Sequence, residues 1–195
     1  MAPSSHPPSA LRTIRRYITT HNSDGKAVLS KTPEPVIPTR DVLQGDIKFN
    51  LAYTNQQQPS ISSDGDIQTY ERYLKDPPAI VVPGGTVCRF CDFAPGTISP
   101  MHRTISLDFG VVVEGEMELV LDSGEVQHLY PGDTVVQRGT NHAWRNVTPE
   151  VVMNGEKVRP WARMFFVLQA ANAVELANGE RLEEDEGGID RGANS

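Results

Sequence analysis

A short stretch of the chain, residues 96–115, carries polar side chains at regular two-residue spacing: His102, Thr104, Ser106 and Asp108. The residues around them are mostly apolar and β-branched, which is typical of a strand. Alternate residues of an extended strand point to the same face, so we expect these four side chains to share one face. An imidazole and a carboxylate on a buried face need compensation for their lost hydration. The spacing therefore predicts a polar site in the interior of the fold.

A second histidine lies further along the chain, in the run "QRGTNHAWRN". If that run forms a strand facing the same interior, His142 converges on His102 and Asp108. Two imidazoles and one carboxylate suit a divalent transition metal, and they leave coordination positions open for substrate or oxygen. A bound cation would compensate the buried polar groups. The three residues are therefore candidate metal ligands.

The elements that must position these residues have a β-rich pattern. From residue 80 onward, short β-rich runs alternate with glycine turns, which predicts an all-β fold built as a single antiparallel barrel or jelly roll. Residues 14–30 are expected to form two short strands around an Asn-Ser-Asp-Gly turn, and residues 47–55 alternate as another strand. The spacing of apolar residues predicts a short helix over residues 66–76. We expect one or two short helices in all.

Two motifs in this region resemble those of the cupin family. The first cupin motif is Gly, five residues, His-x-His, three or four residues, Glu, six residues and Gly, and it matches Gly96, His102, Thr104, Asp108 and Gly115. The second is Gly, five residues, Pro-x-Gly, two residues, His, three residues and Asn, and it matches Gly132, Gln137, Gly139, His142 and Asn146. Thr104 stands in place of the second histidine and Asp108 in place of the glutamate. Gln137 stands in place of the proline, and the gap before it is one residue short.

The resemblance implies a cupin domain over residues 11–172 with its motif core at 96–146. A Pro/Ser-rich N-terminal tail, 1–10, is expected to be disordered, and an acidic C-terminal tail, 173–195, to be mostly solvated. For the site, the resemblance implies His102, Asp108 and His142 as ligands of a divalent metal ion. Iron(II) is the first choice, with zinc, manganese and nickel as alternatives.

Catalysis and substrate binding are assigned to neighbouring residues. Asp108 and Thr104 are the candidate catalytic residues, with Thr104 expected to hydrogen-bond a bound water or the substrate. Arg103 and Arg138 are the candidates for holding an anionic or carbonyl group of the substrate. Trp144, two residues after His142 and on the same face of a strand, is the third candidate for substrate binding. Each has a structural alternative: a surface salt bridge for the arginines, core packing for Trp144, and an ion pair with Arg103, Arg138 or Arg145 for Asp108.

Charge and composition argue against some classes of binding partner and indicate where in the cell the protein is expected. The net charge of −7 argues against nucleic acid and anionic membranes, both of which favour cationic proteins. The N-terminal segment lacks the apolar middle section of a signal peptide, so the cytoplasm is the expected location. Cys88 and Cys91 lie in the strand-like run "TVCRFCDF", where they would point to opposite faces. We interpret them as packing residues rather than a redox or zinc pair.

The sequence also resembles the single-domain cupin-type oxidoreductases of fungal secondary-metabolite pathways. That resemblance implies a metal-dependent oxidoreductase acting on a small aromatic or polyketide-like molecule. A cupin decarboxylase or isomerase is the alternative within enzymes, and a metal-free small-molecule-binding accessory protein is the alternative outside them. A homodimer is expected, in which residues 10–29 serve as an exchanged arm; the competing interpretation is that this segment closes its own barrel.

Overall fold

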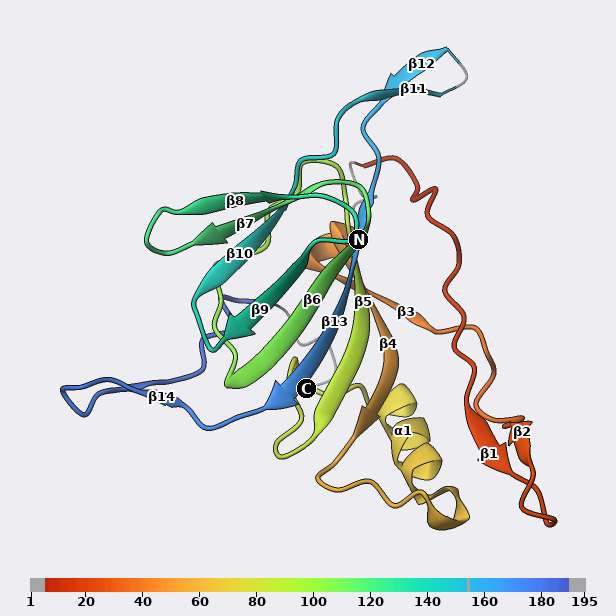
Figure 1. The fold of residues 1–195 in the computed structure, drawn as a ribbon. Helices are drawn as coiled ribbons and strands as arrows, with labels where there is room; N and C mark the ends of the chain where they lie inside the picture. Colours follow the sequence, from red (N-terminus) through yellow and green to blue (C-terminus); the bar gives the residue numbers. More distant parts are fainter. Residues whose placement is uncertain (1–5, 154, 190–195) are drawn as a thin grey trace.

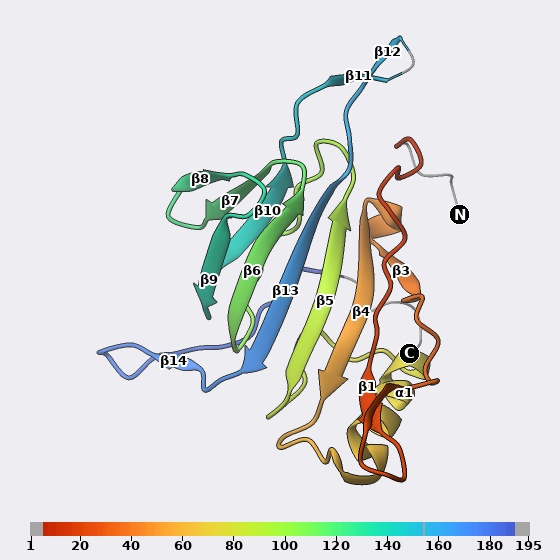
Figure 2. The same cartoon turned by 45° about the vertical axis from the view of Figure 1, so that its right-hand side comes forward.

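The computed structural model describes residues 6–153 and 155–189 of the chain. It confirms the predicted all-β jelly roll, with two antiparallel sheets packed face to face (Figures 1 and 2). The parts of the predicted tails at residues 1–5 and 190–195 lie outside the described residues. No helix in the described ranges is long and apolar enough to span a bilayer.

The larger sheet has six strands in the order β3-β4-β5-β13-β6-β9. Their bounds are Thr39–Val42 for β3, Ile47–Asn55 for β4, Thr86–Phe93 for β5, Ala162–Ala170 for β13, Ser106–Glu114 for β6 and Thr134–Arg138 for β9. The smaller sheet has the order β10-β7-β8, with bounds His142–Asn146, Met117–Leu121 and Val126–Leu129. Apolar side chains of both sheets, among them Phe93, Val112, Met117, Trp144 and Met164, form one shared core.

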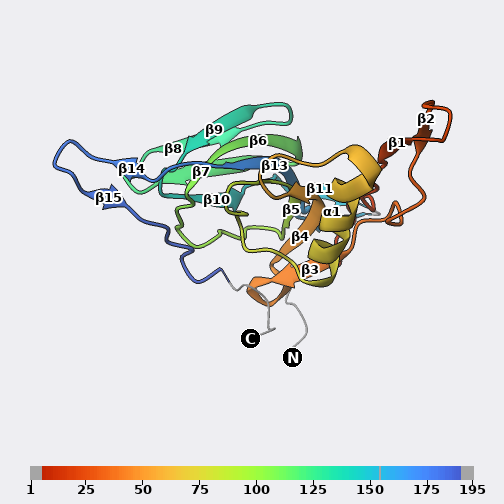
Figure 3. The same cartoon turned by 90° about the horizontal axis from the view of Figure 1, so that it is seen from below.

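Three two-stranded hairpins project from this sandwich (Figure 1). They are β1–β2 at Thr19–His21 and Ala27–Leu29, β11–β12 at Val151–Met153 and Glu156–Val158, and β14–β15 at Val174–Glu175 and Arg181–Leu182. The helix α1, Gly65–Lys75, lies beside β4 at one edge, and the β14–β15 hairpin extends at the opposite end (Figure 3). Two short 3₁₀ turns lie at Leu43–Gly45 and Ser62–Asp64.

Most of the predicted elements are confirmed, and one is wrong. The strand at 47–55, the hairpin within 14–30 and the helix near 66–76 are all present. The regular strand assumed through His102 and Asp108 is the exception, because β6 begins only at Ser106. The preceding segment pairs instead with β10 of the smaller sheet, through bridges at Ile98 and His102. The chain therefore crosses from one sheet to the other between His102 and Ser106.

The C-terminal segment differs from the solvated tail expected from its composition. Arg103 and Asp185 exchange two backbone hydrogen bonds, and Ile189 is buried with 8% of its surface exposed. Gly187 approaches Met101 so closely that a Cβ would lie 2.2 Å from the Met101 carbonyl oxygen. Residues 185–189 therefore pack on the body of the fold, because one apolar residue and a close-fitting glycine outweigh an acidic composition.

Two motif glycines at opposite ends of the 96–115 stretch allow a matched prediction. Gly96 and Gly115 both have positive φ, at +70° and +80°, but a Cβ on Gly96 would meet nothing within 4 Å. A Cβ on Gly115 would lie 2.5 Å from Thr148 Oγ1 and 2.8 Å from Ala162 Cβ. We expect Gly115→Ala to lower the free energy of unfolding by about 2–3 kcal/mol, and Gly96→Ala by about 1 kcal/mol. Urea denaturation measures both, and equal losses would contradict the role of the close contact.

Candidate active site

His102 and His142 lie directly opposite each other at the junction of the two sheets. Each backbone N–H donates to the carbonyl of the other residue at 2.9 Å, so the pair forms a small antiparallel bridge. Residues opposite each other on paired strands carry their side chains on the same face. The two imidazole rings are accordingly neighbours, with centroids 4.3 Å apart.

The hydrogen bonds of the two rings define which nitrogens are open. Nδ1 of His102 lies 2.9 Å from the Pro100 carbonyl oxygen, and Nδ1 of His142 lies 2.9 Å from the Thr140 carbonyl oxygen. A carbonyl can only accept, so each Nδ1 carries the proton and donates it. The Nε2 lone pair of each neutral ring is then free, which is the arrangement of most metal-binding histidines.

Burial keeps both rings in this neutral form. Desolvation lowers the pKa of His102, and it lowers the pKa of His142 to about 4, with the neighbouring His102 as a second cause. A proton on either ring would place a charge in an apolar wall and beside the other imidazole. The pair is therefore held as two neutral nitrogen donors at neutral pH.

The rings face a cavity of about 50 Å³ between the sheets. That volume holds a few water molecules. The cavity wall is largely apolar, and its polar members are few. Those polar side chains are Arg89, Ser99, His102, Thr104, Asp108 and His142, and the apolar wall includes Phe49, Trp144, Phe166 and Ile189.

Asp108 and Thr104 occupy the β6 side of this cavity. Ser106 Oγ donates to Thr104 Oγ1 at 2.9 Å, and Thr104 Oγ1 donates to Asp108 Oδ2 at 3.3 Å. The other carboxylate oxygen, Oδ1, is buried without a hydrogen-bond partner. Desolvation raises the pKa of Asp108 to about 6, against the opposing effect of the two hydroxyls and of Arg89. Asp108 lines the cavity and keeps one carboxylate oxygen without a hydrogen-bond partner.

Comparison with known proteins matches a family model to the part of the chain that contains both histidines. The family model of the cupin domain matches residues 89–154. "Phomopsin biosynthesis cluster protein D" of Diaporthe leptostromiformis is 43% identical over 167 residues, covering 85% of this chain and 83% of the relative. "Cupin-domain-containing oxidoreductase virC" of Hypocrea virens is 38% identical over 185 residues, covering 92% of this chain and 88% of the relative. The chain belongs to the cupin family.

A solved cupin gives a more distant comparison. The RmlC-like cupin from Shewanella frigidimarina NCIMB 400 is 15% identical, with a TM-score of 0.44, and the match covers 69% of this chain and 85% of the other. The closer sequence relatives carry the names of fungal biosynthesis-cluster proteins and of cupin-domain-containing oxidoreductases.

Cupins commonly bind a metal ion, so the donor set of this cupin can be tested for one. The two free Nε2 atoms fit a shared ion, since both are neutral donors on one wall of the cavity. Asp108 does not complete the predicted set: in the described ranges, no three His, Cys, Asp or Glu side chains gather closely enough to hold an ion. The chain crosses between the sheets within this stretch, so His102 pairs with the smaller sheet while Asp108 lies on the larger one.

Of the three predicted substrate-binding residues, one lies in the cavity wall and two lie outside the cavity. Trp144 is buried in the cavity wall, and its ring lies edge-on to His142 at 5.5 Å. Arg103 has the opposite parity to His102 and reaches the Glu183 carbonyl, outside the cavity. Arg138 is exposed and lines a separate surface hollow near Ala171. The structure thus brings Trp144 to the histidines but neither arginine.

One cation in the cavity wall was not predicted. Arg89 comes from β5, seven residues before the first motif glycine, and is 4% exposed. In the run "TVCRFCDF", nothing distinguishes Arg89 from any other residue of a strand. Because Arg89 is two residues from Cys91 and four from Phe93, however, its side chain lies with theirs on the interior face of the strand. Ile189 was also missed, because it lies in the acidic tail.

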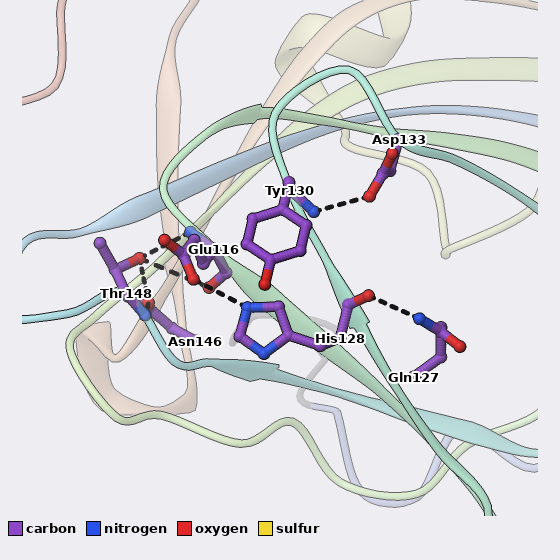
Figure 4. A network of polar contacts seen from close by, with 7 residues as sticks. All are labelled: Glu116, Gln127, His128, Tyr130, Asp133, Asn146 and Thr148. Atoms are coloured by element: carbon purple, nitrogen blue, oxygen red, sulfur yellow. Dashed lines mark hydrogen bonds and ion pairs between the residues drawn. The ribbon is translucent and has the colours of Figure 1, made fainter.

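A further histidine, His128, lies outside the cavity, and of the two cysteines only Cys91 reaches it. His128 on β8 is bound to Glu116 at 2.8 Å, in a network that also contains Tyr130 and Thr148 (Figure 4). Cys91 lines the cavity and Cys88 points the other way, as their spacing predicts. Desolvation raises the pKa of both thiols, and that of Cys91 to about 12, so neither is a ready nucleophile.

Proposed function

We propose that this cupin is a metal-dependent oxidoreductase acting on a small organic intermediate, aromatic or polyketide-like, in secondary-metabolite biosynthesis. The observation that carries the proposal is the adjacent His102–His142 pair with both Nε2 atoms open to one cavity. The names of the fungal relatives supply the biosynthetic context and the reaction class. The homodimer and the cytoplasmic location stay predictions from the sequence.

Each part of the site has a separate task in this function. His102 and His142 would hold a divalent ion, which would supply Lewis-acid or redox chemistry when bound. Asp108 is placed to accept or return a proton through its open Oδ1, because Oδ2 is already held by Thr104. Trp144 and Phe166, whose rings are 5.4 Å apart, form an apolar wall of the cavity beside the histidine pair. Ile189 excludes water from the C-terminal side.

A second function has an observation of its own in its favour. Among the described residues, Asp108 forms no three-residue metal group with the histidine pair, and its Oδ1 is buried without a hydrogen-bond partner. Such an oxygen can move a proton between two carbons of a substrate without assistance from an ion. A cupin isomerase or decarboxylase that uses Asp108 as its proton carrier is therefore the alternative.

Metabolite comparison followed by a reconstituted assay tests the two functions. The gene is deleted in the producing organism, and the compound that accumulates is identified by mass spectrometry. That compound is then incubated with the purified full-length protein, with and without EDTA, while oxygen uptake is recorded. We expect turnover with oxygen uptake, loss of turnover in EDTA, and recovery on addition of iron(II).

The other outcomes point to specific alternatives. Turnover that persists in EDTA without oxygen uptake would reject the metal-dependent oxidoreductase and favour the Asp108 isomerase or decarboxylase. Binding of the accumulated compound without any turnover would instead favour the accessory binding protein. The His128→Ala variant serves as the control, because His128 lies outside the cavity and should leave turnover unchanged.

A further inference from the structure

Arg89 is a buried cation on the same cavity as the histidine pair. It projects from β5 toward the interior, and only 4% of its surface is exposed. Arginine is almost never fully buried unless it is paired. In residues 6–153 and 155–189, however, no ion pair joins Arg89 to a carboxylate. The charge of this guanidinium therefore lacks a direct counterion.

The contacts of Arg89 fix its orientation without neutralising it. Nη2 donates to the carbonyl oxygens of Ala79 at 3.0 Å and Ile80 at 2.9 Å. The guanidinium carbon lies 5.0 Å from the ring centroid of Phe49, a cation–π contact. The buried Nε has no hydrogen-bond partner. One side of the guanidinium is thus anchored, and a donor remains available on it.

Acidic side chains act on Arg89 as charges. Burial lowers the pKa of Arg89, and the charges of Asp108 and Glu186 oppose that shift. Asp108 Oδ1 and Arg89 Nε are two buried polar atoms, each without a hydrogen bond, and they belong to two residues that line one cavity. A buried donor that lacks a partner costs free energy, which a suitable ligand atom recovers on binding. A carboxylate supplies both the acceptor and the missing negative charge.

We propose that Arg89 binds a carboxylate group of the substrate. This extends the proposed function, because it names the chemical class of the molecule that the histidine pair would act on. Arg89 and Phe49 also line an outer hollow of about 230 Å³ that includes Tyr73, Leu74 and Pro77. The inner cavity is too small for a large molecule, so the body of the substrate lies in the outer hollow while its acidic end is held at Arg89.

Benzoate and benzamide provide a matched pair of probes, because they share size and ring but differ in charge. The full-length protein is titrated with each by ligand-observed NMR. We expect benzoate to bind about tenfold tighter than benzamide or better, the typical strength of a hydrogen bond to a charged group. In Arg89→Gln the two affinities should agree within about twofold, because the charge is gone. Arg89→Lys should keep an intermediate preference, since it retains the charge but loses the planar fork.

Two further variants isolate the role of Arg89. Arg159→Gln, at an exposed position, should keep the full preference for benzoate. The double variant His102→Ala/His142→Ala should also keep it, so failure of the metal proposal and failure of the carboxylate proposal are separately visible. No preference in the wild-type protein, or an unchanged preference in Arg89→Lys and Arg89→Gln, would overturn the proposal. If Arg89→Gln does not fold, the wild-type and lysine measurements still decide it.

Discussion

The double variant His102→Ala/His142→Ala is expected to lose its metal ion and its turnover together. Both open Nε2 atoms disappear, and in the described part of the chain no other group of His, Cys, Asp or Glu side chains could hold the ion. Loss of a supporting hydrogen bond to a metal ligand already costs about 10–100-fold in affinity, so loss of both ligands should exceed about 100-fold. Metal analysis of protein purified without chelator, followed by an iron(II) titration, measures the effect.

The same variant should still fold, which makes the result interpretable. The two hydrogen bonds that join residues 102 and 142 are between backbone atoms, so alanine preserves them. The variant loses only the Nδ1–H bonds to Pro100 and Thr140, at about 1 kcal/mol each. A small shift of the melting temperature is therefore expected beside a large loss of metal.

A histidine elsewhere in the fold provides the control. His128 is the partner of Glu116 on the smaller sheet, outside the cavity, so His128→Ala should keep the wild-type metal content. Full metal content in the double histidine variant would remove the basis of the metal-dependent function. A loss of metal that His128→Ala reproduces would show that the ion is bound on the surface.

Motif spacing predicted the parts of the site that depend on local geometry. Strand alternation placed His102, Thr104, Ser106 and Asp108 on the buried side, and all four are buried. The sequence also predicted that His142 converges on the first histidine, and in the structure the two residues form a bridge. The burial follows from period-two alternation, and the convergence was expected from the two motifs.

The change of sheet between His102 and Asp108 could not be predicted in the same way. Alternation continues through residues 102–108, but the hydrogen-bonding partner changes from β10 to β13 and β9 along it. A change of sheet does not alter the two-residue alternation of polar side chains, so residues 102–108 have the sequence pattern of a single strand. Arg89 was missed for a related reason, because only the packing of β5 against the cavity distinguishes it from a solvent-facing arginine.

The ion pair between Asp92 and Arg163 gives the largest stability prediction. Asp92→Ala is expected to lower the free energy of unfolding by about 3–5 kcal/mol, because it leaves the buried Arg163 guanidinium without its counterion. The pair is bidentate, with Nε–Oδ1 at 2.6 Å and Nη2–Oδ2 at 2.7 Å, and the two side chains are 8% and 6% exposed. The residues are direct cross-strand neighbours on β13 and β5. Urea denaturation followed by circular dichroism measures the loss.

The N-terminal segment at residues 7–12, the N-terminal arm, explains why this pair is buried on the face opposite the cavity. Asp92 has the opposite parity to Cys91 and Phe93, so it points away from the core. Arg163 Nη1 donates to the Arg12 carbonyl at 2.8 Å, and the indole of Trp161 donates to the Pro7 carbonyl at 2.9 Å. The arm therefore covers the pair, and Asp92→Ala should also expose the arm to limited proteolysis before the body of the fold.

A surface ion pair supplies the matched control for this prediction. Arg159 and Glu150 lie 3.5 Å apart with side chains 62% and 49% exposed, so Glu150→Ala should change the free energy of unfolding by less than about 1 kcal/mol. Replacing both buried partners, as Asp92→Leu/Arg163→Met, should recover much of the loss, because no uncompensated charge then remains. A loss in Asp92→Ala no larger than in Glu150→Ala would mean that water reaches Arg163, and that the arm does not seal this face.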